Sequence, residues 1–415
     1  MSPSHADIAV SFGRAVRDRD FDDAVALFGP EKIQLVDEIR ARHNLPLGDD
    51  LEFFLRRLRC AVRALNGDIK SVSARQMNET DEMVTVLLTF ECEDSRQELS
   101  VEFDRDGNAV NLSSPDRYTP PSYADASDFE EYSITLDAEG TELDAIATVP
   151  TSSESVPVAV LVPGAGEIDK NATVGPNKLF QDIAWGLATE NIATLRYDKR
   201  EAVTEIPEEK RTLENLYFTD GVRAAQRAAK RVDTDSVVFV GHSQGGRCAF
   251  EMARQYGDAG GVAALDPPVI KPLEGDGQQL RNLLKIDGLV PPHFEQAVKN
   301  YRTQKEQFHS QSADNQPSVF LNSMWNYDQF ETAASLSTPL LLYEMELNRQ
   351  APAEKRERWR EVLSNDRDTI HRGSELNHNC QRGEQPRSIL EPVLFHKNVD
   401  KRVITDLADW IFAST

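Results

Sequence analysis

The stretch VVFVGHSQGG, residues 237–246, decides the fold. It opens with a continuous apolar run, typical of a strand buried on both faces, and the segment that follows it, RCAFEMARQY, is helical in character. A serine in a sharp turn between such a strand and helix adopts a strained backbone conformation that exposes its hydroxyl above the sheet. Small residues at 241 and 245 let neighbouring chains approach, and the helix N-terminus adds positive potential for an oxyanion. We therefore predict that Ser243 is a nucleophile.

The segments around this turn alternate between strands and helices. Such alternation predicts a mostly parallel α/β sheet, preceded here by a hairpin around the turn at 138–140. The further predicted strands are VAVLVP (158–163), ATLRYD (193–198), GVAALD (261–266) and PLLLYE (339–344), with helices near 178–189, over 213–231 and from 245.

Composition shifts along the 415 residues predict more than one domain. Residues 1–111 read as a small α+β unit, residues 112–128 as a Pro-, Ser- and Asp-rich linker, and residues 129–415 as the α/β domain. Between 267 and 338 the alternation stops. We expect a helical lid there, and the alternative is a peripheral helical pair without a role.

In the first unit, apolar spacing predicts helices over 4–28 and 31–43 and another that begins after Asp49-Asp50. Alternating patterns then predict strands over 69–78, 83–92 and 97–104.

The formal net charge is −23, from 69 acidic and 46 basic residues. A chain this acidic is repelled by nucleic acid and by anionic lipid, so neither is expected as a partner. The acidic excess fits either a salt-rich host or an ordinary acidic protein. The N-terminus has no signal-peptide pattern, and no apolar run is long enough to span a membrane, so we expect a cytoplasmic protein.

The four cysteines are far apart in the sequence and show no metal-ligand spacing. We expect buried, reduced thiols, no metal and no cofactor.

A serine hydroxyl is a weak nucleophile and needs a base. With this type of turn the order along the chain is serine, acid, histidine, which leaves three late histidines, His371, His378 and His396. His378 lies in the polar loop GSELNHNCQRG (373–383) and is the best placed of the three. His242, beside the serine, is expected to point away from it.

The acid that orients the histidine should follow the strand at 339–343. The residues there, from Glu344 to Asn348, include no aspartate. Glu346 or Asn348 must therefore serve, or the acid comes from elsewhere, such as Asp366 or Asp368.

The loop PGAG (163–166) follows the first buried parallel strand. Its small residues expose backbone N–H groups, so we expect the amides of Ala165 and Gln244 to form an oxyanion hole. A plain tight turn is the alternative reading of this loop.

Taken together, these segments resemble the α/β-hydrolase superfamily over residues 130–412. More narrowly, they resemble its serine esterase branch whose members carry a small cystatin- or NTF2-like domain at the N-terminus. The matching segments are VLVPGAGEIDKN, GPNKLFQDIAWGLA, TLRYDKR, VGHSQGG, PLLLYEMELNRQ and ELNH.

The resemblance implies a carboxylesterase-type serine hydrolase that acts on small esters through an acyl-enzyme, with thioesters as the nearest relatives. It implies Ser243 as the nucleophile and, through the match of Leu376-Asn377-His378, His378 as the base. It also implies that Asp198, Lys199 and Arg200 are structural.

This sequence departs from the family at two places. The usual His-Gly-x-Gly of the oxyanion loop has Pro163 in place of the histidine, and the catalytic aspartate lines up with Asn348. An amide can hold a histidine by a hydrogen bond but carries no charge to stabilise imidazolium.

A second hypothesis follows from these departures: a hydrolase-fold binding or regulatory protein with impaired or vestigial catalysis. A peptidase is a third, although no segment indicates a peptide groove. The N-terminal unit could add to a pocket, mediate formation of a homodimer, or do neither.

Overall fold

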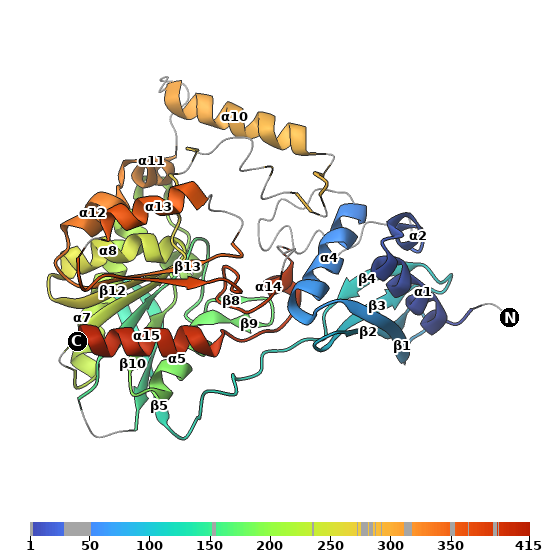
Figure 1. Ribbon diagram of the computed structural model, residues 1–415, viewed down its shortest axis with the longest axis horizontal. Coiled ribbons are helices and arrows are strands. Elements are labelled where there is room, and N and C mark those ends of the chain that lie inside the picture. Colours follow the sequence, from blue (N-terminus) through green and yellow to red (C-terminus); the bar gives the residue numbers. More distant parts are fainter. Residues whose placement is uncertain are drawn as a thin grey trace.

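The computed structural model describes residues 3–28, 51–151, 155–234, 236–271, 273–274, 281, 285–286, 288–291, 293–310, 318–348, 353–363, 365–384, 388 and 390–415. The predicted helix over 31–43 lies outside these residues. Within them, the chain forms a four-stranded sheet, an eight-stranded sheet and a small two-stranded ribbon. Figure 1 shows the larger sheet with its helices at one end of the molecule and the smaller sheet at the other.

The eight-stranded sheet has the order β14-β13-β12-β11-β7-β10-β6-β5. The hairpin β5–β6 and the pair β6–β10 are antiparallel, and every other neighbouring pair is parallel. Its strands are β5 (Phe129–Ala138), β6 (Thr141–Pro150), β7 (Val158–Val162), β10 (Ala193–Tyr197), β11 (Val237–His242), β12 (Ala259–Leu265), β13 (Leu340–Met345) and β14 (Thr369–Gly373). The mostly parallel sheet predicted from the apolar runs is confirmed.

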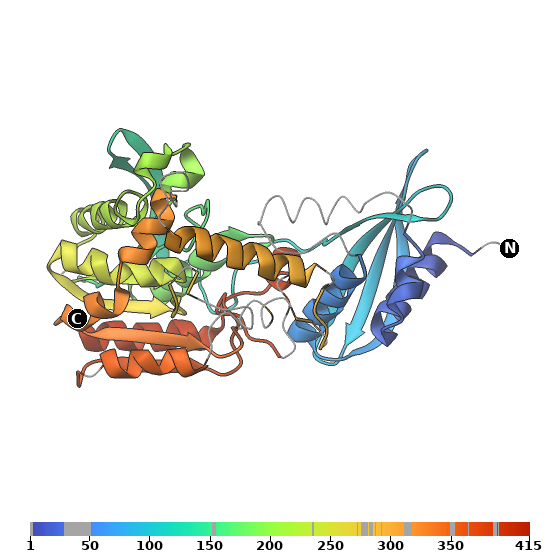
Figure 2. The same cartoon turned by 90° about the horizontal axis from the view of Figure 1, so that it is seen from above.

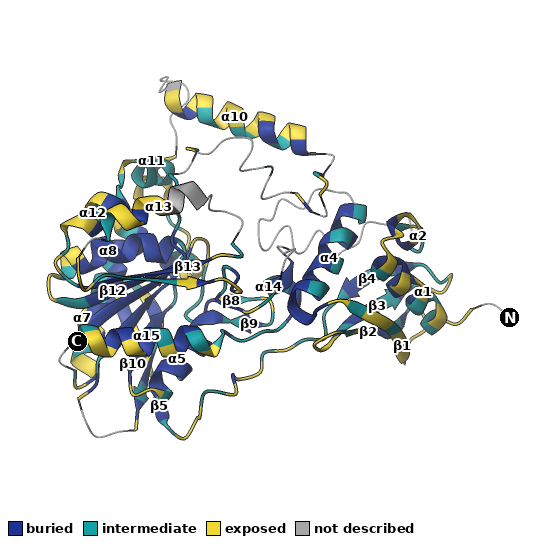
Figure 3. Cartoon of the chain, viewed as in Figure 1, coloured by how far each residue is buried: buried dark blue, intermediate teal, exposed yellow. Residues whose placement is uncertain are grey.

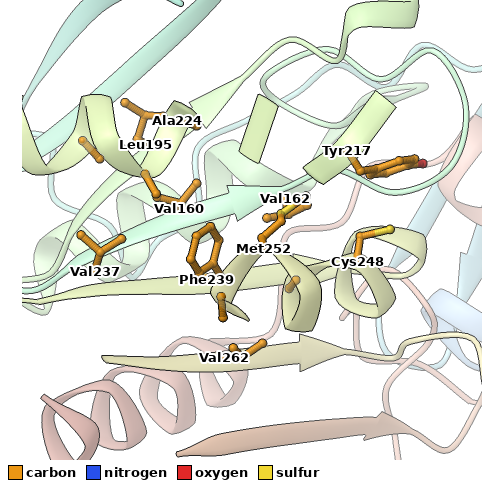
Figure 4. Close-up of a cluster of buried hydrophobic side chains, with 14 of the residues drawn as sticks. Val160, Val162, Leu195, Tyr217, Ala224, Val237, Phe239, Cys248, Met252 and Val262 are labelled. Atoms are coloured by element: carbon orange, nitrogen blue, oxygen red, sulfur yellow. The ribbon is translucent and has the colours of Figure 1, made fainter. Parts of the chain in front are cut away.

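Helices cover both faces of this sheet. In β7, Val158, Val160 and Val162 join the cluster formed with one helical layer, whereas Ala159 and Leu161 join the cluster of the other. This period of two explains why the strand is a continuous apolar run. One layer is α7 (Thr219–Arg231), α8 (Gln244–Tyr256), α12 (Gln329–Ser335) and α13 (Ala353–Val362), and the other is α5 (Leu179–Thr189) and α15 (Lys401–Ser414). Figure 4 shows the side chains of the first cluster between β11 and the helices.

Shorter elements connect these layers. The ribbon β8 (Thr173–Val174) and β9 (Asn177–Lys178) precedes α5. After β10 come α6 (Arg200–Val203), the 3-10 turn η1 (Glu208–Lys210) and the π-helical turn η2 (Glu214–Phe218), which runs directly into α7.

The four-stranded sheet is an antiparallel meander with helices packed on it. Its elements are α1 (His5–Asp18), α2 (Phe21–Val25), α4 (Leu51–Asn66), β1 (Ile69–Glu79), β2 (Val84–Cys92), β3 (Arg96–Phe103) and β4 (Ala109–Ser113). The single helix predicted over 4–28 is wrong, because Arg19 adopts the left-handed conformation, with φ 71°, and ends α1. Figure 2 shows this unit separated from the large sheet by an extended connection.

The C-terminal part of the chain returns to this N-terminal unit. The helix α14 (Glu391–Leu394) packs on α4, and Leu390, Leu394 and Phe395 are buried in the cluster of the N-terminal unit. The Lys397 ammonium also donates to the Leu65 carbonyl. The segment that follows the His378 loop is therefore fixed against the N-terminal unit.

The described part of 267–338 contains α10 (Phe294–Ser310), α11 (Val319–Asn326) and α12. The helix α12 packs beside α8, and its Phe330 lies in the same hydrophobic cluster as Val160 of β7. The helix α10, in contrast, is largely exposed (Figure 3). The role of this segment as a lid stays a prediction. No helix in the described ranges is long and apolar enough to cross a membrane.

Candidate active site

Ser243 occupies the turn between β11 and α8, with φ 54° and ψ −123°. Its backbone N–H donates to the Leu265 carbonyl of the neighbouring strand at 2.9 Å. A Cβ on Gly245 would lie 2.2 Å from the Val162 carbonyl oxygen, and one on Gly241 would lie 2.4 Å from the Gly245 carbonyl oxygen. Both contacts are with backbone that cannot yield, so the turn requires glycine at these two positions.

His378 lies in the loop after β14, and its Nδ1 is 2.7 Å from Oδ2 of Asp266. Asp266 is 6% exposed, so this carboxylate is largely withdrawn from water. A carboxylate at this distance accepts the Nδ1 proton and leaves the lone pair of the other ring nitrogen, Nε2, available. The pair can therefore act as an oriented base.

Asp266 immediately follows β12 and has φ 48°, an uncommon conformation for a non-glycine residue. Its backbone N–H donates to the Tyr343 carbonyl at 2.8 Å, which continues the pairing of β12 with β13. The Asn348 amide nitrogen donates to Asp266 Oδ2 at 2.5 Å. The Met345 N–H donates to the other carboxylate oxygen, Oδ1, at 3.4 Å, so a backbone N–H contacts one oxygen and the Asn348 amide contacts the other.

The carboxylate that contacts His378 follows β12, whereas the sequence predicted an acid after β13. Asn348, the expected acid position, lies within 3.3 Å of His378 Nδ1, but its amide contacts Asp266. Glu346 is exposed on the turn after β13, and no contact is seen between it and His378 in the described residues. Asp368 accepts from the Leu340 amide at the opposite end of β13, and Asp366 is exposed.

Asp266 was missed although its position carries a signal. It is the last residue of the predicted strand GVAALD, and the carboxyl ends of parallel strands are where functional groups gather. The expected chain order placed the acid after the following strand, at 339–343.

The two other late histidines lie elsewhere. His371 stacks on Tyr343 and lies 3.8 Å from an oxygen of Asp406. His396 contacts the Thr119 hydroxyl and the Pro176 carbonyl at the junction with the N-terminal unit. Of the three candidates, His378 lines the same cavity as Ser243.

His242 does not point away from the site as expected, because its ring packs on the ring of His378 with centroids 4.7 Å apart. Its Nε2 lies 2.7 Å from the His378 carbonyl oxygen, which can only accept, so Nε2 carries the proton. Burial lowers the pKa of His242 to about 3, with a smaller contribution from the charge of His378. His242 is therefore a neutral donor that holds the backbone of the histidine loop.

The loop after β7 lies against the serine. A Cβ on Gly164 would be 3.5 Å from Cβ of Ser243, and Gly164 and Ala165 both line the cavity at the site. Gln244 begins α8, where backbone N–H groups have no acceptor within the helix. Both residues predicted for an oxyanion hole thus lie next to Ser243.

A cavity of about 300 Å³ opens beside these groups. Ser243, His242 and His378 form one wall of it, and both apolar and polar side chains complete it. None of the described residues between 267 and 338 is among its lining. The remaining lining residues are Ile168, Ala172, Val174, Asn177, Lys178, Leu179, Asp182, Asn379, Gln381, Lys397 and Val399.

Cys248 lies on α8 one turn after the serine, and burial raises the pKa of its thiol to about 12. It therefore stays protonated and does not compete as a nucleophile. Over the described ranges, no group of three or more His, Cys, Asp or Glu side chains could hold a metal ion.

The sheet order and the serine turn define an α/β-hydrolase. Over 335 residues the chain is 31% identical to Esterase EstD of Thermotoga maritima, an alignment that covers 78% of this chain and 79% of that protein. The chain therefore belongs to the esterases of the α/β-hydrolase superfamily.

Solved structures of esterases are also similar. Est1E from Butyrivibrio proteoclasticus is 14% identical, with a TM-score of 0.45 over 68% of this chain and 98% of that chain. Brefeldin A esterase, a bacterial homologue of human hormone sensitive lipase, is 17% identical, with a TM-score of 0.45 over 71% and 79%. Because these scores are below 0.5, the assignment rests on the sequence relative. No protein-family model matches the chain.

The low pKa of His242 makes stability depend on pH. The unfolded chain takes up a proton near the ordinary pKa of 6.5, whereas folded His242 takes it up near 3. Stability is therefore lost as the pH falls between these values, by up to about 1.4 kcal/mol per pH unit from this one group.

In His242→Gln, which keeps an N–H donor, we expect a smaller loss of unfolding free energy between about pH 6.5 and about pH 4, measured by urea denaturation. His309→Gln, on exposed α10, is the control and should keep the wild-type slope. An unchanged slope in His242→Gln would contradict the assignment of a neutral, buried His242.

Proposed function

We propose that this esterase hydrolyses small carboxylic esters or thioesters through an acyl-enzyme on Ser243, with His378 as base and Asp266 as the acid. The observation that carries the proposal is the 2.7 Å contact between His378 Nδ1 and Asp266, on a histidine that lines the same cavity as a strained serine. A nucleophile, a base and a group that orients the base are the parts that acyl transfer requires.

In the first half-reaction, Ser243 Oγ attacks the ester carbonyl carbon while its proton passes to His378 Nε2. The resulting imidazolium donates its Nδ1 proton in the hydrogen bond to Asp266, whose negative charge stabilises it. The tetrahedral intermediate then breaks its bond to the leaving oxygen or sulfur. The leaving group takes the Nε2 proton and departs as an alcohol or thiol, and the acyl group stays on Ser243.

In the second half-reaction, water takes the place of the serine hydroxyl. His378 Nε2 accepts a water proton as the hydroxide attacks the acyl carbon, and it returns that proton to Ser243 Oγ when the acyl bond breaks. The products are a carboxylic acid and the free enzyme, so no cofactor or oxidant is needed to balance the reaction.

The negative charge that develops on the carbonyl oxygen is stabilised by the backbone amides of Ala165 and Gln244. Two observations support this role. Ala165 lines the cavity beside the serine, and Gln244 supplies the first amide of α8, where the helix dipole adds positive potential.

Asn348 supports the acid rather than replacing it. Its amide donates to Asp266 Oδ2, the same oxygen that accepts from His378. Such a donor favours the charged carboxylate and fixes its orientation. The hypothesis of a vestigial enzyme rested on Pro163 and on the lack of a carboxylate at position 348, and the contact of Asp266 with His378 argues against the second of these grounds.

The size of the cavity, about 300 Å³, favours a small substrate. The name of the relative, Esterase EstD, supports esters as the substrate class.

We also propose that the protein acts in a reducing compartment such as the cytoplasm. All four cysteines lie in described parts of the chain and none forms a disulfide, and Cys60, Cys248 and Cys380 are buried. Proteins in oxidising compartments tend instead to pair their cysteines.

Ser243→Ala should abolish turnover, because it removes the proposed nucleophile that carries the acyl group. The measurement is the release of a chromogenic alcohol from a short-chain aryl ester. Wild type should show a burst matching the enzyme concentration and should be labelled by a fluorophosphonate at Ser243. Turnover in the folded alanine variant close to the wild-type rate would refute the serine mechanism.

Asp266→Asn should lower kcat by about ten-thousand-fold, because the amide favours the wrong tautomer of His378 and carries no charge. Asn348→Asp should give no gain at neutral pH. It would place a second carboxylate beside Asp266 and remove the amide that donates to Asp266 Oδ2.

Glu346→Gln, a change of one exposed carboxylate nearby, is the matched control and should keep the wild-type rate. A large gain in Asn348→Asp, or a loss in Glu346→Gln comparable with that in Asp266→Asn, would move the acid away from position 266.

A further inference from the structure

The carbonyl groups of the loop 163–166 are held from outside the cavity. The Tyr217 hydroxyl, from η2, lies 2.9 Å from the Gly164 carbonyl oxygen and donates to it. Tyr217 is 1% exposed and belongs to the hydrophobic cluster of the sheet, where Figure 4 labels it. It is absent from the cavity lining, so the Gly164 carbonyl points into the core.

This direction fixes the neighbouring amide. In a trans peptide the carbonyl of one residue and the N–H of the next point in opposite directions across one rigid plane. Because the Gly164 carbonyl is turned toward Tyr217, the Ala165 N–H is turned toward the cavity. The hydroxyl of Tyr217 thus sets the orientation of a proposed oxyanion donor that it does not touch.

Lys199 sets the direction of the Tyr217 hydroxyl in turn. Its ammonium donates to the Tyr217 oxygen at 2.7 Å and to the Gly166 carbonyl at 3.1 Å. Since an ammonium has no acceptor, the tyrosine oxygen accepts from Lys199 and its own proton goes to Gly164. The Lys199 backbone N–H also donates to the Ile168 carbonyl at 3.0 Å. Lys199 therefore donates to the Gly166 and Ile168 carbonyls. It also orients the Tyr217 hydroxyl, which donates to the Gly164 carbonyl.

A buried cation needs a partner to remain charged. Lys199 is 1% exposed at its side chain, and Glu201 lies 2.5 Å from its ammonium, with Arg211 on the other oxygen of that carboxylate. Burial lowers the pKa of Lys199, and the charge of Glu201 opposes this shift. The lysine is built into the fold as an ion pair beneath the loop.

The sequence of the loop 163–166 explains why its contacts come from other segments. Pro163 stands where related esterases usually have a histidine in the oxyanion loop, and proline has neither a polar side chain nor an N–H. The polar contacts that hold this loop come instead from the segment after β10 and from η2.

We propose that Tyr217 and Lys199 are positioning residues that orient the Ala165 amide toward the oxyanion. The proposal rests on the serine mechanism above, and it gives Lys199 a role beyond the purely structural one that the resemblance implied.

Tyr217→Phe removes only the hydroxyl and tests the proposal. We expect kcat for a short-chain aryl ester to fall by about 10- to 100-fold with KM little changed, because a misdirected donor stabilises the transition state less. Binding of a trifluoromethyl ketone, which forms a charged tetrahedral adduct, should weaken by a similar factor. Binding of the product carboxylic acid, which makes no such adduct, should not change.

Lys199→Met is the second variant, and the double variant should lose little more than either single variant, since both act on one peptide group. Tyr343→Phe is the matched control: it removes a buried hydroxyl that contacts Asp406, away from the cavity, and should keep the wild-type kcat. Circular dichroism and thermal unfolding establish that each variant is folded.

A folded Tyr217→Phe with kcat within twofold of wild type would overturn the proposal. So would a loss confined to KM, or equal losses for the ketone and the carboxylic acid. These outcomes are distinct from a failure of the serine mechanism, which would appear as turnover in Ser243→Ala. If Tyr217→Phe does not fold, Lys199→Met is judged by the same comparisons.

Discussion

The site depends on the close approach of α8 to the end of β7, which leaves no space for a side chain at Gly245. This contact brings the ends of three neighbouring parallel strands together. The loop with Ala165 follows β7, Ser243 follows β11, and Asp266 follows β12, in the order in which the strands lie in the sheet. The Ser243 N–H bond to the Leu265 carbonyl connects the last two. Without glycine at 241 and 245, the sheet could not place the Ala165 amide, Ser243 and Asp266 close to one substrate.

Unlike the other groups of the site, His378 does not directly follow a strand, and other contacts hold the loop that carries it. The neutral His242 donates to its carbonyl, and Gln381, later in the same loop, donates to Asn177 and to the Lys397 carbonyl. The segment beyond, with Leu394 and Phe395, is buried against the N-terminal unit. These contacts connect the loop that carries His378 with the N-terminal unit.

Sequence reasoning could predict the sheet because its central strands are continuous apolar runs. It missed β14, whose residues TIHRG are polar and partly exposed at the sheet edge. It predicted Ser243 as the nucleophile because the turn has a local pattern, and it predicted Ala165 and Gln244 as oxyanion donors from their positions relative to that turn. It could not assign the acid, because the contact of Asp266 with His378 joins residues 112 positions apart. The hydrogen bond from Tyr217 to the Gly164 carbonyl could not be predicted for the same reason, because no local pattern encodes it.

The central claim is that Asp266, and not a residue after β13, is hydrogen-bonded to the proposed base, His378. Proton NMR of the resting enzyme tests it most directly, through the resonance of the His378 Nδ1 proton far downfield of the amide region. We predict that this resonance is present in wild type and in Glu346→Gln and is absent or shifted strongly upfield in Asp266→Asn. An unchanged resonance in folded Asp266→Asn, together with its loss in Glu346→Gln, would contradict the account.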